Sequence, residues 1–142
     1  MDSRLEIVEL HESTDDRGWS FSLIEENLKP MGDIKDVHIA EIKPGQIRGN
    51  HYHAKRGEFI TVVYQGQWSL HWDTGEGTTV HHKEYKGRGA VLVTPPLNWS
   101  HAVRNDGESS IWIFVASNQA YDRDEKDEHK RDAIRRVVAH RV

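Results

Sequence analysis

The 142-residue sequence contains no cysteine. This absence excludes disulfide bonds, thiolate nucleophiles and cysteine-ligated zinc, so any metal must be held by histidine and carboxylate side chains. Long apolar runs are missing too. No stretch reaches the roughly 18 apolar residues of a membrane span, and the N-terminus lacks a basic region followed by an apolar one. We therefore expect a cytoplasmic protein that has no membrane partner.

An excess of positive charge is also absent. The chain carries 19 Lys and Arg against 23 Asp and Glu, and its net charge is −4. The basic residues are spread among acidic ones except near the C-terminus, so no electropositive stripe is present that would follow a phosphate backbone. We expect no nucleic acid partner.

The sequence does contain enough aromatic side chains for one compact core. Five Trp, four Tyr and three Phe accompany a hydrophobic fraction of 36%, and 30% of the residues are charged. Disordered chains lack such aromatic content, and a chain of this length can bury roughly two-thirds of its extended surface. We expect one folded domain with a charged surface.

Turn signals recur at short intervals along most of the chain. They include Asp16-Arg17-Gly18, Pro44-Gly45, Arg56-Gly57, Gln65-Gly66, Gly87-Arg88-Gly89 and Asn105-Asp106-Gly107. Between them, Trp68, Leu70 and Trp72 alternate with polar residues, while 59–64 and 111–116 are continuous runs of β-forming residues. Many short strands between glycine and proline turns indicate an all-β barrel or sandwich.

The segment 122–142 has a different character. It begins with acidic and ends with basic residues, as a helix dipole prefers, and an apolar stripe at helical spacing is formed by Ala133, Ile134, Val137 and Val138. We predict a C-terminal α-helix docked by this stripe; the alternative is a solvated and partly frayed tail. The predicted organisation is a β-barrel over 1–121 followed by this helix or tail.

A candidate metal site lies between Gly45 and Phe59. In a strand, residues two apart project from the same face, so His51 and His53 can direct two imidazoles to one point. Glu58 has the opposite parity, but a turn at 54–57 resets the register and lets Glu58 face the same point. Such a set suits Zn, Ni, Mn or Fe(II). Because scattering the ten histidines at random gives roughly 0.7 pairs of this spacing, the pair alone decides nothing.

The wider pattern resembles the two sequence motifs of the cupin family. The first is carried by Gly45, His51, His53, Glu58 and Gly66. The second is carried by Gly89, Pro96, His101 and Asn105, with Asn98 in the place of a glycine, a substitution that suits a positive φ. The resemblance, with a motif core over 45–105, implies a cupin double-stranded β-helix, which is a jelly-roll barrel. It also implies one divalent transition metal, zinc first and Ni, Mn or Fe(II) as alternatives, held by His51, His53, Glu58 and His101.

A closer resemblance points to a branch of this family. Residues 48–53, Arg-Gly-Asn-His-Tyr-His, are similar to the Arg-Gly-x-His stretch of dTDP-4-dehydrorhamnose 3,5-epimerases and dTDP-hexose ketoisomerases, and Asp16-Arg17-Gly18 resembles their N-terminal strand. The pattern is also similar to the zinc-binding cupin domain that ends capsular polysaccharide synthesis reductases. In the ketoisomerases the position of Glu58 tends to be Gln and no metal is needed, so Glu58 favours a metal. These resemblances imply an epimerase or isomerase whose small sugar-like substrate is nucleotide-linked or belongs to a polysaccharide pathway.

The implied reaction removes a proton next to a carbonyl, which creates an enediolate that a divalent cation can stabilise. We predict Glu58 and His51 as catalytic residues. His51 aligns with the epimerases' catalytic histidine, although as a metal ligand it would not be free to act as a base. Arg48 is a candidate for binding a diphosphate, with a surface ion pair as the alternative. Trp99 is a candidate for stacking on a sugar ring or base, with core packing or a dimer contact as the alternative.

Two other functions remain open. Fe(II) cupins share the His-His-Glu-His set, so a metal-dependent cupin dioxygenase is one alternative. A non-catalytic barrel that binds a sugar or another ligand is the other. We also expect a homodimer, because cupins resembling this chain commonly pair and because the edge strands predicted at 5–10 and 19–23 need covering. The remaining histidines, among them His71, are interpreted as surface or structural groups.

Overall fold

The computed structural model describes residues 4–120, 124 and 127–134. Most of its regular structure is β-strand, as the short strand signals predict. The elements are β1 (Glu6–Glu9), β2 (His11–Glu12), β3 (Phe21–Ser22), α1 (Glu25–Leu28), the 3₁₀ turn η1 (Lys29–Met31), β4 (Asp36–Ile42), β5 (Ile47–Tyr52), β6 (Glu58–Gln65), β7 (Trp68–Trp72), β8 (His81–Tyr85), β9 (Arg88–Thr94), β10 (His101–Asn105), β11 (Ile111–Ser117) and β12 (His129–Lys130). Within the described part of the chain, no helix has the length and apolar character needed to cross a membrane.

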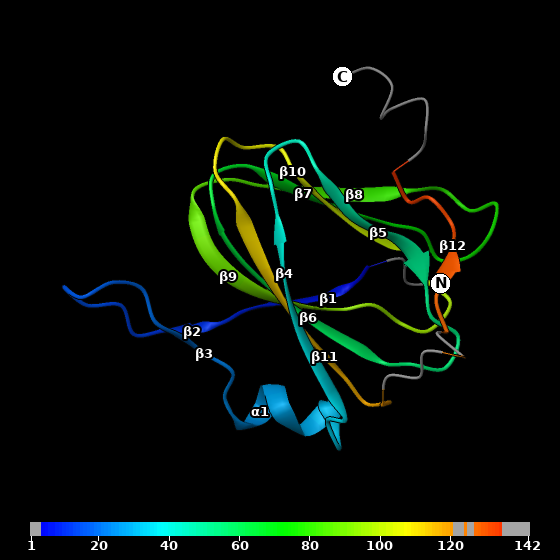
Figure 1. Ribbon diagram of the computed structural model, residues 1–142, viewed down its shortest axis with the longest axis horizontal. Helices are drawn as coiled ribbons and strands as arrows, with labels where there is room; N and C mark the ends of the chain where they lie inside the picture. The colour runs from blue at the N-terminus through cyan, green and yellow to red at the C-terminus, as the bar shows by residue number, and fades with distance from the viewer. Residues whose placement is uncertain (1–3, 121–123, 125–126, 135–142) are drawn as a thin grey trace.

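Two antiparallel sheets of five strands each form the barrel (Figure 1). One has the order β1-β9-β6-β11-β4 and the other the order β12-β5-β10-β7-β8. From β4 to β7, and again from β8 to β11, each step along the chain crosses from one sheet to the other. This alternation is the jelly-roll arrangement, so the predicted all-β cupin fold is confirmed.

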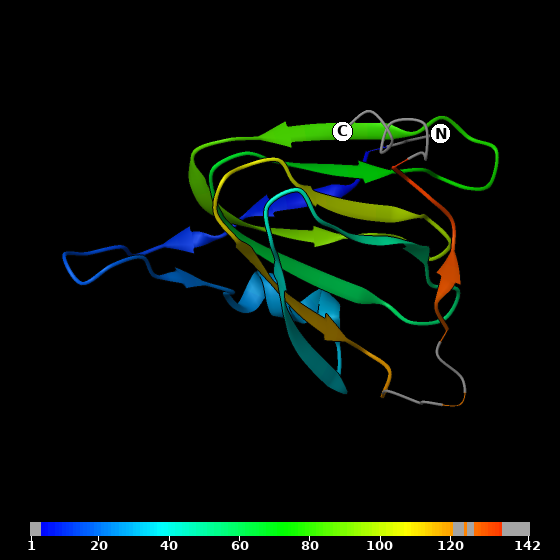
Figure 2. The same ribbon diagram turned by 45° about the horizontal axis from the view of Figure 1, so that its top comes forward.

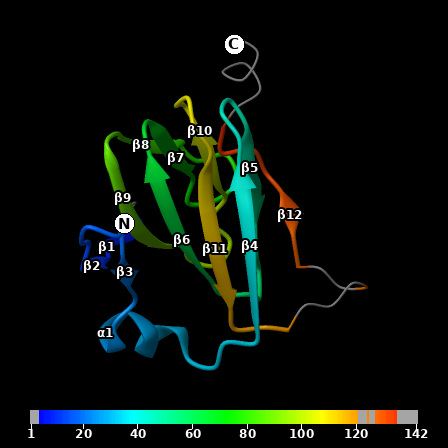
Figure 3. The same ribbon diagram turned by 60° about the vertical axis from the view of Figure 1, so that its left-hand side comes forward.

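The hydrophobic core lies between the two sheets. Val62 of β6 and Trp68 and Leu70 of β7 have no exposed surface. The continuous apolar run of β6 is explained by burial on both faces, because Phe59 packs on the outer side with Met31 of η1. Figure 3 shows α1 and the separate strands β2 and β3 beside the sheet that contains β6.

The two edges of this sheet differ in what covers them and in how apolar they are. At one edge β1 pairs with β9, and the chain then continues into the β2–β3 hairpin, which extends beyond the barrel (Figure 2). There the guanidinium of Arg88 lies 4.8 Å from the ring centre of Trp19. At the other edge β4 pairs with β11 on one side and leaves Val37 and Ile39 each 59% exposed. The β4 edge is therefore the more apolar of the two.

The prediction of a C-terminal helix is wrong for the described part of the segment 122–142. Residues 129–130 form β12, which pairs with β5, and Ala133 and Ile134 are buried beside Ala102 of β10. Docking of these two residues is confirmed, but not as a helical stripe; Val137 and Val138 lie outside the described residues. Pairing with the edge of β5 satisfies backbone groups of both segments, and this tertiary gain overrides the local helical pattern.

Candidate metal centre

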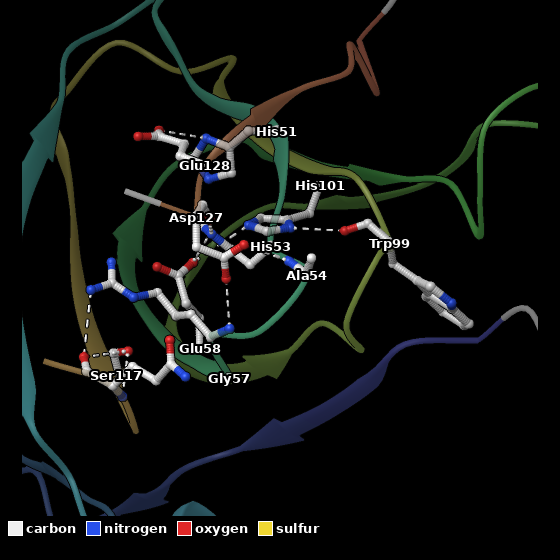
Figure 4. Close-up of polar contacts among 12 residues, drawn as sticks. His51, His53, Ala54, Gly57, Glu58, Trp99, His101, Ser117, Asp127 and Glu128 are labelled. Atoms are coloured by element: carbon white, nitrogen blue, oxygen red, sulfur yellow. Dashed lines mark hydrogen bonds and ion pairs between the residues drawn. The ribbon is translucent and has the colours of Figure 1, made fainter. Parts of the chain in front are cut away.

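The four predicted ligands come from the ends of three strands. His51 lies on β5, His53 follows directly after that strand ends, Glu58 is the first residue of β6, and His101 is the first residue of β10. The turn at 54–57 does reset the register, as the sequence predicts, so that Glu58 faces both histidines. His51 and His101 are directly opposite each other across the β5–β10 ladder. Figure 4 shows the four side chains pointing toward one another.

A glycine allows β5 to approach β10 closely at this point. Gly49 has φ of 103°, and a Cβ added there would lie 2.6 Å from the carbonyl oxygen of His101. The ladder also shifts register between His101 and Ala102. Only glycine fits such a position without moving the backbone. The Arg-Gly stretch before His51 therefore has a structural reason, which is to bring the β5 histidines next to His101.

The ligand atoms of the four residues all lie within 4.8 Å of one another. Oε1 of Glu58 is 3.0 Å from Nε2 of His53 and 3.7 Å from Nε2 of His101. His53, Glu58 and His101 are buried, with 6%, 6% and 3% exposure, whereas His51 is partly exposed. The set thus has a buried floor and one ligand nearer to solvent.

Two nitrogens of this cluster lack the hydrogen bonds that buried polar atoms normally make. Nε2 of His53 and Nε2 of His101 are buried without a hydrogen-bond partner, despite their proximity to the carboxylate. Leaving such atoms unsatisfied costs free energy, and a cation bound between them would remove that cost. Imidazole nitrogens with one carboxylate oxygen are the ligands that zinc and similar divalent metals take in proteins. The residues present therefore fit a divalent metal.

The opposite nitrogen of each ring is already engaged. Nδ1–H of His53 donates to the carbonyl of Asp127 at 2.6 Å, and Nδ1 of His101 lies 3.3 Å from the carbonyl of Trp99. Nδ1 of His51 lies 3.0 Å from a carboxylate oxygen of Glu128. These outer contacts fix the tautomers so that Nε2 of each ring is left as the coordinating atom.

The electrostatics favour the metal-binding protonation state for His51 and Glu58 but not for His53. Burial, followed by the neighbouring His101 and His53, lowers the pKa of His51 to about 3, so His51 is neutral at pH 7. Burial alone would raise the pKa of Glu58, but contacts with His101 and His53 hold this pKa well below its usual range. Burial opposes a charge on His53 too, yet the Glu58 carboxylate outweighs it and raises the pKa of His53.

A cavity of about 690 Å³ opens above the cluster, a size typical of small-molecule sites. Its walls include apolar side chains of both sheets, among them Ile60 and Val103, and several charged groups at the mouth. Arg48 lines it, with Nε donating to the carbonyl of Glu41 at 2.8 Å. Arg56 lines it too and lies 3.3 Å from Asp36.

Of the two predicted substrate-binding residues, one lines the cavity and the other does not. Arg48 belongs to the cavity wall, but the side chain of Trp99 points away from the cluster in Figure 4 and packs against the core. The alternative of core packing agrees with this position. His71, interpreted as structural, is buried with Nε2 2.9 Å from the Ser69 hydroxyl.

Sequence reasoning missed two contacts made by the C-terminal segment. The backbone carbonyl of Asp127 touches His53, and the carboxylate of Glu128 touches His51. The sequence pattern places their acidic run at the start of a helix, and no local pattern distinguishes acidic residues at a helix start from residues whose carbonyl or carboxylate reaches a histidine more than 70 residues away.

Solved structures of a capsular polysaccharide assembling protein and of two sugar isomerases share the fold of this chain. Capsular polysaccharide assembling protein CapF from Staphylococcus aureus is 22% identical, with a TM-score of 0.62 over 87% of this chain and 32% of its own length. QdtA, a sugar 3,4-ketoisomerase from Thermoanaerobacterium thermosaccharolyticum, is 18% identical, with a TM-score of 0.64 over 87% of this chain and 85% of its own. A dTDP sugar isomerase from Desulfovibrio desulfuricans G20 is 12% identical, with a TM-score of 0.69 over 92% and 85%.

These matches differ in how much of each relative they cover. The chain spans about a third of the length of CapF but most of the length of the two isomerases. Among curated protein sequences, none matches the chain. A family model does: the polysaccharide biosynthesis C-terminal domain matches residues 13–129. Because this match covers most of the sequence and contains all four residues of the metal cluster, the chain belongs to the polysaccharide biosynthesis C-terminal domain family.

Proposed function

We propose that this protein is a metal-binding cupin that isomerises or epimerises a nucleotide-linked or polysaccharide-pathway sugar. The observation that carries the proposal is the convergence of three imidazoles and one carboxylate at the floor of a cavity of about 690 Å³. Membership of a polysaccharide biosynthesis family supports a sugar substrate. QdtA, which shares the fold, was solved in complex with TDP, which supports a nucleotide-linked one.

The proposed ligands of the metal are His51, His53, Glu58 and His101, with zinc the first candidate. When bound there, a divalent cation would supply positive charge for a carbonyl oxygen of the substrate, where negative charge develops when the neighbouring C–H loses its proton. Glu58 and His51 are the proposed proton-transfer groups, because both line the cavity and both are unprotonated at neutral pH by the direction of their pKa shifts. A side chain whose lone pair is bound to the metal is not free to take a proton, so the proposal requires one of the two to be released from the metal in the reaction.

Arg48 is the proposed contact for the diphosphate of the substrate. Its bond to the Glu41 carbonyl orients the guanidinium plane at the cavity wall, and a planar guanidinium pairs with phosphate oxygens through two parallel hydrogen bonds. Arg48→Lys keeps the charge but loses this fork. We expect it to weaken binding of a TDP-sugar more than binding of the sugar alone.

One observation favours a second function. Three histidines with one carboxylate also suit Fe(II), so a metal-dependent dioxygenase is the second candidate. The two functions differ in the metal they need and in whether oxygen is consumed.

The test begins with elemental analysis of protein purified without chelator or a histidine tag. A panel of nucleotide sugars is then screened by thermal shift. Compounds that bind are followed by NMR in D₂O, where an isomerase exchanges the proton next to the carbonyl for deuterium.

Bound zinc or nickel together with deuterium exchange in the substrate supports the proposal, whereas bound iron together with oxygen uptake favours the dioxygenase. Stabilisation without exchange identifies a non-catalytic binder, and less than about 0.1 equivalent of metal with no stabilisation by added metal refutes the metal site.

We also propose a homodimer that forms through the outer face of β4 and β11. The apolar side chains exposed there are Val37 and Ile39, each 59% exposed, Trp112, 46%, and Phe114, 39%. β4 is an edge strand, and an antiparallel edge pairs with a second copy of itself about a two-fold axis.

Light scattering of the wild type should give the mass of a dimer, and Ile39→Lys should give a monomer with an unchanged circular dichroism spectrum. A wild-type monomer at micromolar concentration contradicts this proposal.

A further inference from the structure

The C-terminal segment 127–134, called here the strap, crosses the outside of the metal cluster. Its first two residues reach the cluster itself: the carbonyl of Asp127 accepts from His53, and the carboxylate of Glu128 lies against His51. Figure 4 shows both contacts arriving from the same side of the cluster. The strap therefore supplies the outer hydrogen-bond partners of two of the four ligands.

Asp127 also organises the turn that separates His53 from Glu58. Its carboxylate accepts from the backbone N–H groups of Ala54 at 3.0 Å, Lys55 at 2.8 Å and Arg56 at 2.7 Å. Asp127 has φ of 33°, a region that aspartate tolerates better than most residues. One residue thus orients a ligand through its carbonyl and holds the loop between two ligands through its side chain.

The strap is anchored at a distance from the ligands by Arg131. The guanidinium lies 2.8 Å from the carboxylate of Asp73, whose side chain has no exposed surface, and 4.4 Å from the ring centre of Tyr52. The backbone N–H of Arg131 donates to the carbonyl of Asn50 at 3.1 Å. The backbone N–H of Ile134 donates to the side-chain oxygen of Asn50 at 2.9 Å. Docking of the strap therefore depends in part on side-chain contacts of Arg131 that do not involve the four candidate ligands, in addition to the backbone pairing of Lys130 with His51.

We propose that Asp127 and Glu128 are positioning residues of the metal site, so that docking of the strap and binding of the metal stabilise each other. This inference rests on the metal site proposed above. The physical reason is linkage: the docked strap orients His53 and His51 for coordination, and by reciprocity a bound metal favours the docked strap by the same factor. A strap with a purely structural role would change the stability of the fold but leave metal affinity unchanged.

The first experiment separates the anchor from the ligands. The zinc Kd of the full chain is measured by competition with a chromogenic chelator for the wild type, for Arg131→Met and for the control Arg104→Gln. Arg104 pairs with Asp106 elsewhere on the barrel, and its side chain is similarly enclosed, 26% exposed against 14% for Arg131. We expect Arg131→Met to weaken zinc binding by about 10- to 100-fold and the control to leave it unchanged.

The second experiment removes the contact with His51 and then restores it. We expect Glu128→Ala to weaken zinc binding by about 10-fold, and Glu128→Gln to recover part of this loss because its amide oxygen still accepts a hydrogen bond. The Glu128 side chain is 52% exposed, so both variants should fold like the wild type. They keep the inference testable if Arg131→Met is unfolded.

The third experiment uses the wild type alone. Amide hydrogen exchange is followed with and without zinc at residues 54–56, Arg131 and Ile134, with Gly66 in a distant turn as the control. We expect zinc to slow exchange in the strap and in the 54–56 turn but not at Gly66. The inference is overturned, and the metal site is left standing, if the wild type binds one zinc, the Arg131 and Glu128 variants bind zinc equally well, and zinc does not change amide exchange. Wild-type protein that binds neither zinc nor added Ni, Mn or Fe(II) overturns both.

Discussion

The two ends of the barrel interior are built by the same strands but hold opposite kinds of side chain. β6 begins with Glu58 in the metal cluster and has Tyr64 near its other end, in an aromatic group with Trp68 and Tyr85. The rings of Trp68 and Tyr85 stack with centres 4.4 Å apart. One end is thus an open cavity over unpaired imidazole nitrogens, and the other is filled by packed aromatic rings.

Both ends also contain buried polar atoms without hydrogen-bond partners, but for different reasons. At the cavity end these are Nε2 of His53 and His101, which a cation would satisfy; at the closed end they are Nε1 of Trp68 and the hydroxyl of Tyr85. At the closed end, the packing of large rings outweighs the cost of the unsatisfied polar tips. The comparison indicates that the closed end stabilises the fold and that the cavity end is the candidate functional site, and it can be tested by changing one end at a time.

The largest expected effect is on stability, from Trp68→Ala. Trp68 has no exposed surface, and truncating a buried ring of this size costs about 3–5 kcal/mol of unfolding free energy. Urea denaturation measures this loss, with Leu97→Ala, at a position 45% exposed, as a control expected to change stability by no more than about 0.5 kcal/mol. The folded variant should still bind one zinc; loss of zinc would show that the ends are not independent.

The next effect is at the cavity end, from removal of the metal. At a free zinc concentration of 100 times Kd, binding should stabilise the wild type by about 2.7 kcal/mol, and chelator should remove this gain. His53→Ala should abolish both stoichiometric zinc and the gain, whereas His71→Ala, which removes a similarly buried histidine outside the cluster, should keep both. Glu58→Gln keeps the shape but loses the charge and should weaken zinc binding without abolishing it. Equal zinc content in His53→Ala and the wild type would contradict the site.

The two ends should also respond to opposite extremes of pH. Ligand histidines must be neutral to bind a metal, and the raised pKa of His53 makes it the more easily protonated of the two ligand histidines with shifted pKa, so zinc should leave as the pH falls, which elemental analysis after dialysis measures. This loss should be the same in the wild type and in Tyr85→Phe, because the closed end takes no part in it.

The smallest effect is at the closed end in alkali. Burial, followed by the neighbouring Tyr64 and Glu9, raises the pKa of Tyr85 to about 12 from an ordinary value of 10.0. A raised pKa stabilises the fold fully below the unfolded value, so this contribution should be lost as the pH rises from about 10 to 12. The loss should be on the order of 1 kcal/mol, since Tyr85 is only partly buried. Tyr85→Phe should remove this part of the pH dependence in urea titrations and leave stability at pH 7 unchanged or higher, and an unaltered alkaline slope would refute it.

Much of the cavity end could be predicted from the sequence because its determinants are local. The period of two in a strand places His51 and His53 on one face, and the turn at 54–57 brings Glu58 to that face. Asn98, expected to stand at a positive φ in the place of a glycine, has φ of 69°. The all-β fold follows from the same signals, since short β-forming runs between glycine turns leave few other folds open.

Tertiary structure alone decided how the C-terminal segment is used. Its charge pattern and apolar spacing suit a helix, but the edge of β5 offers backbone partners that a helix start does not, so residues 129–130 became a strand. That pairing brings Asp127 to His53 and Glu128 to His51. Contacts between segments more than 70 residues apart depend on which edge stays open once the barrel has closed, and no local pattern in the sequence carries that information.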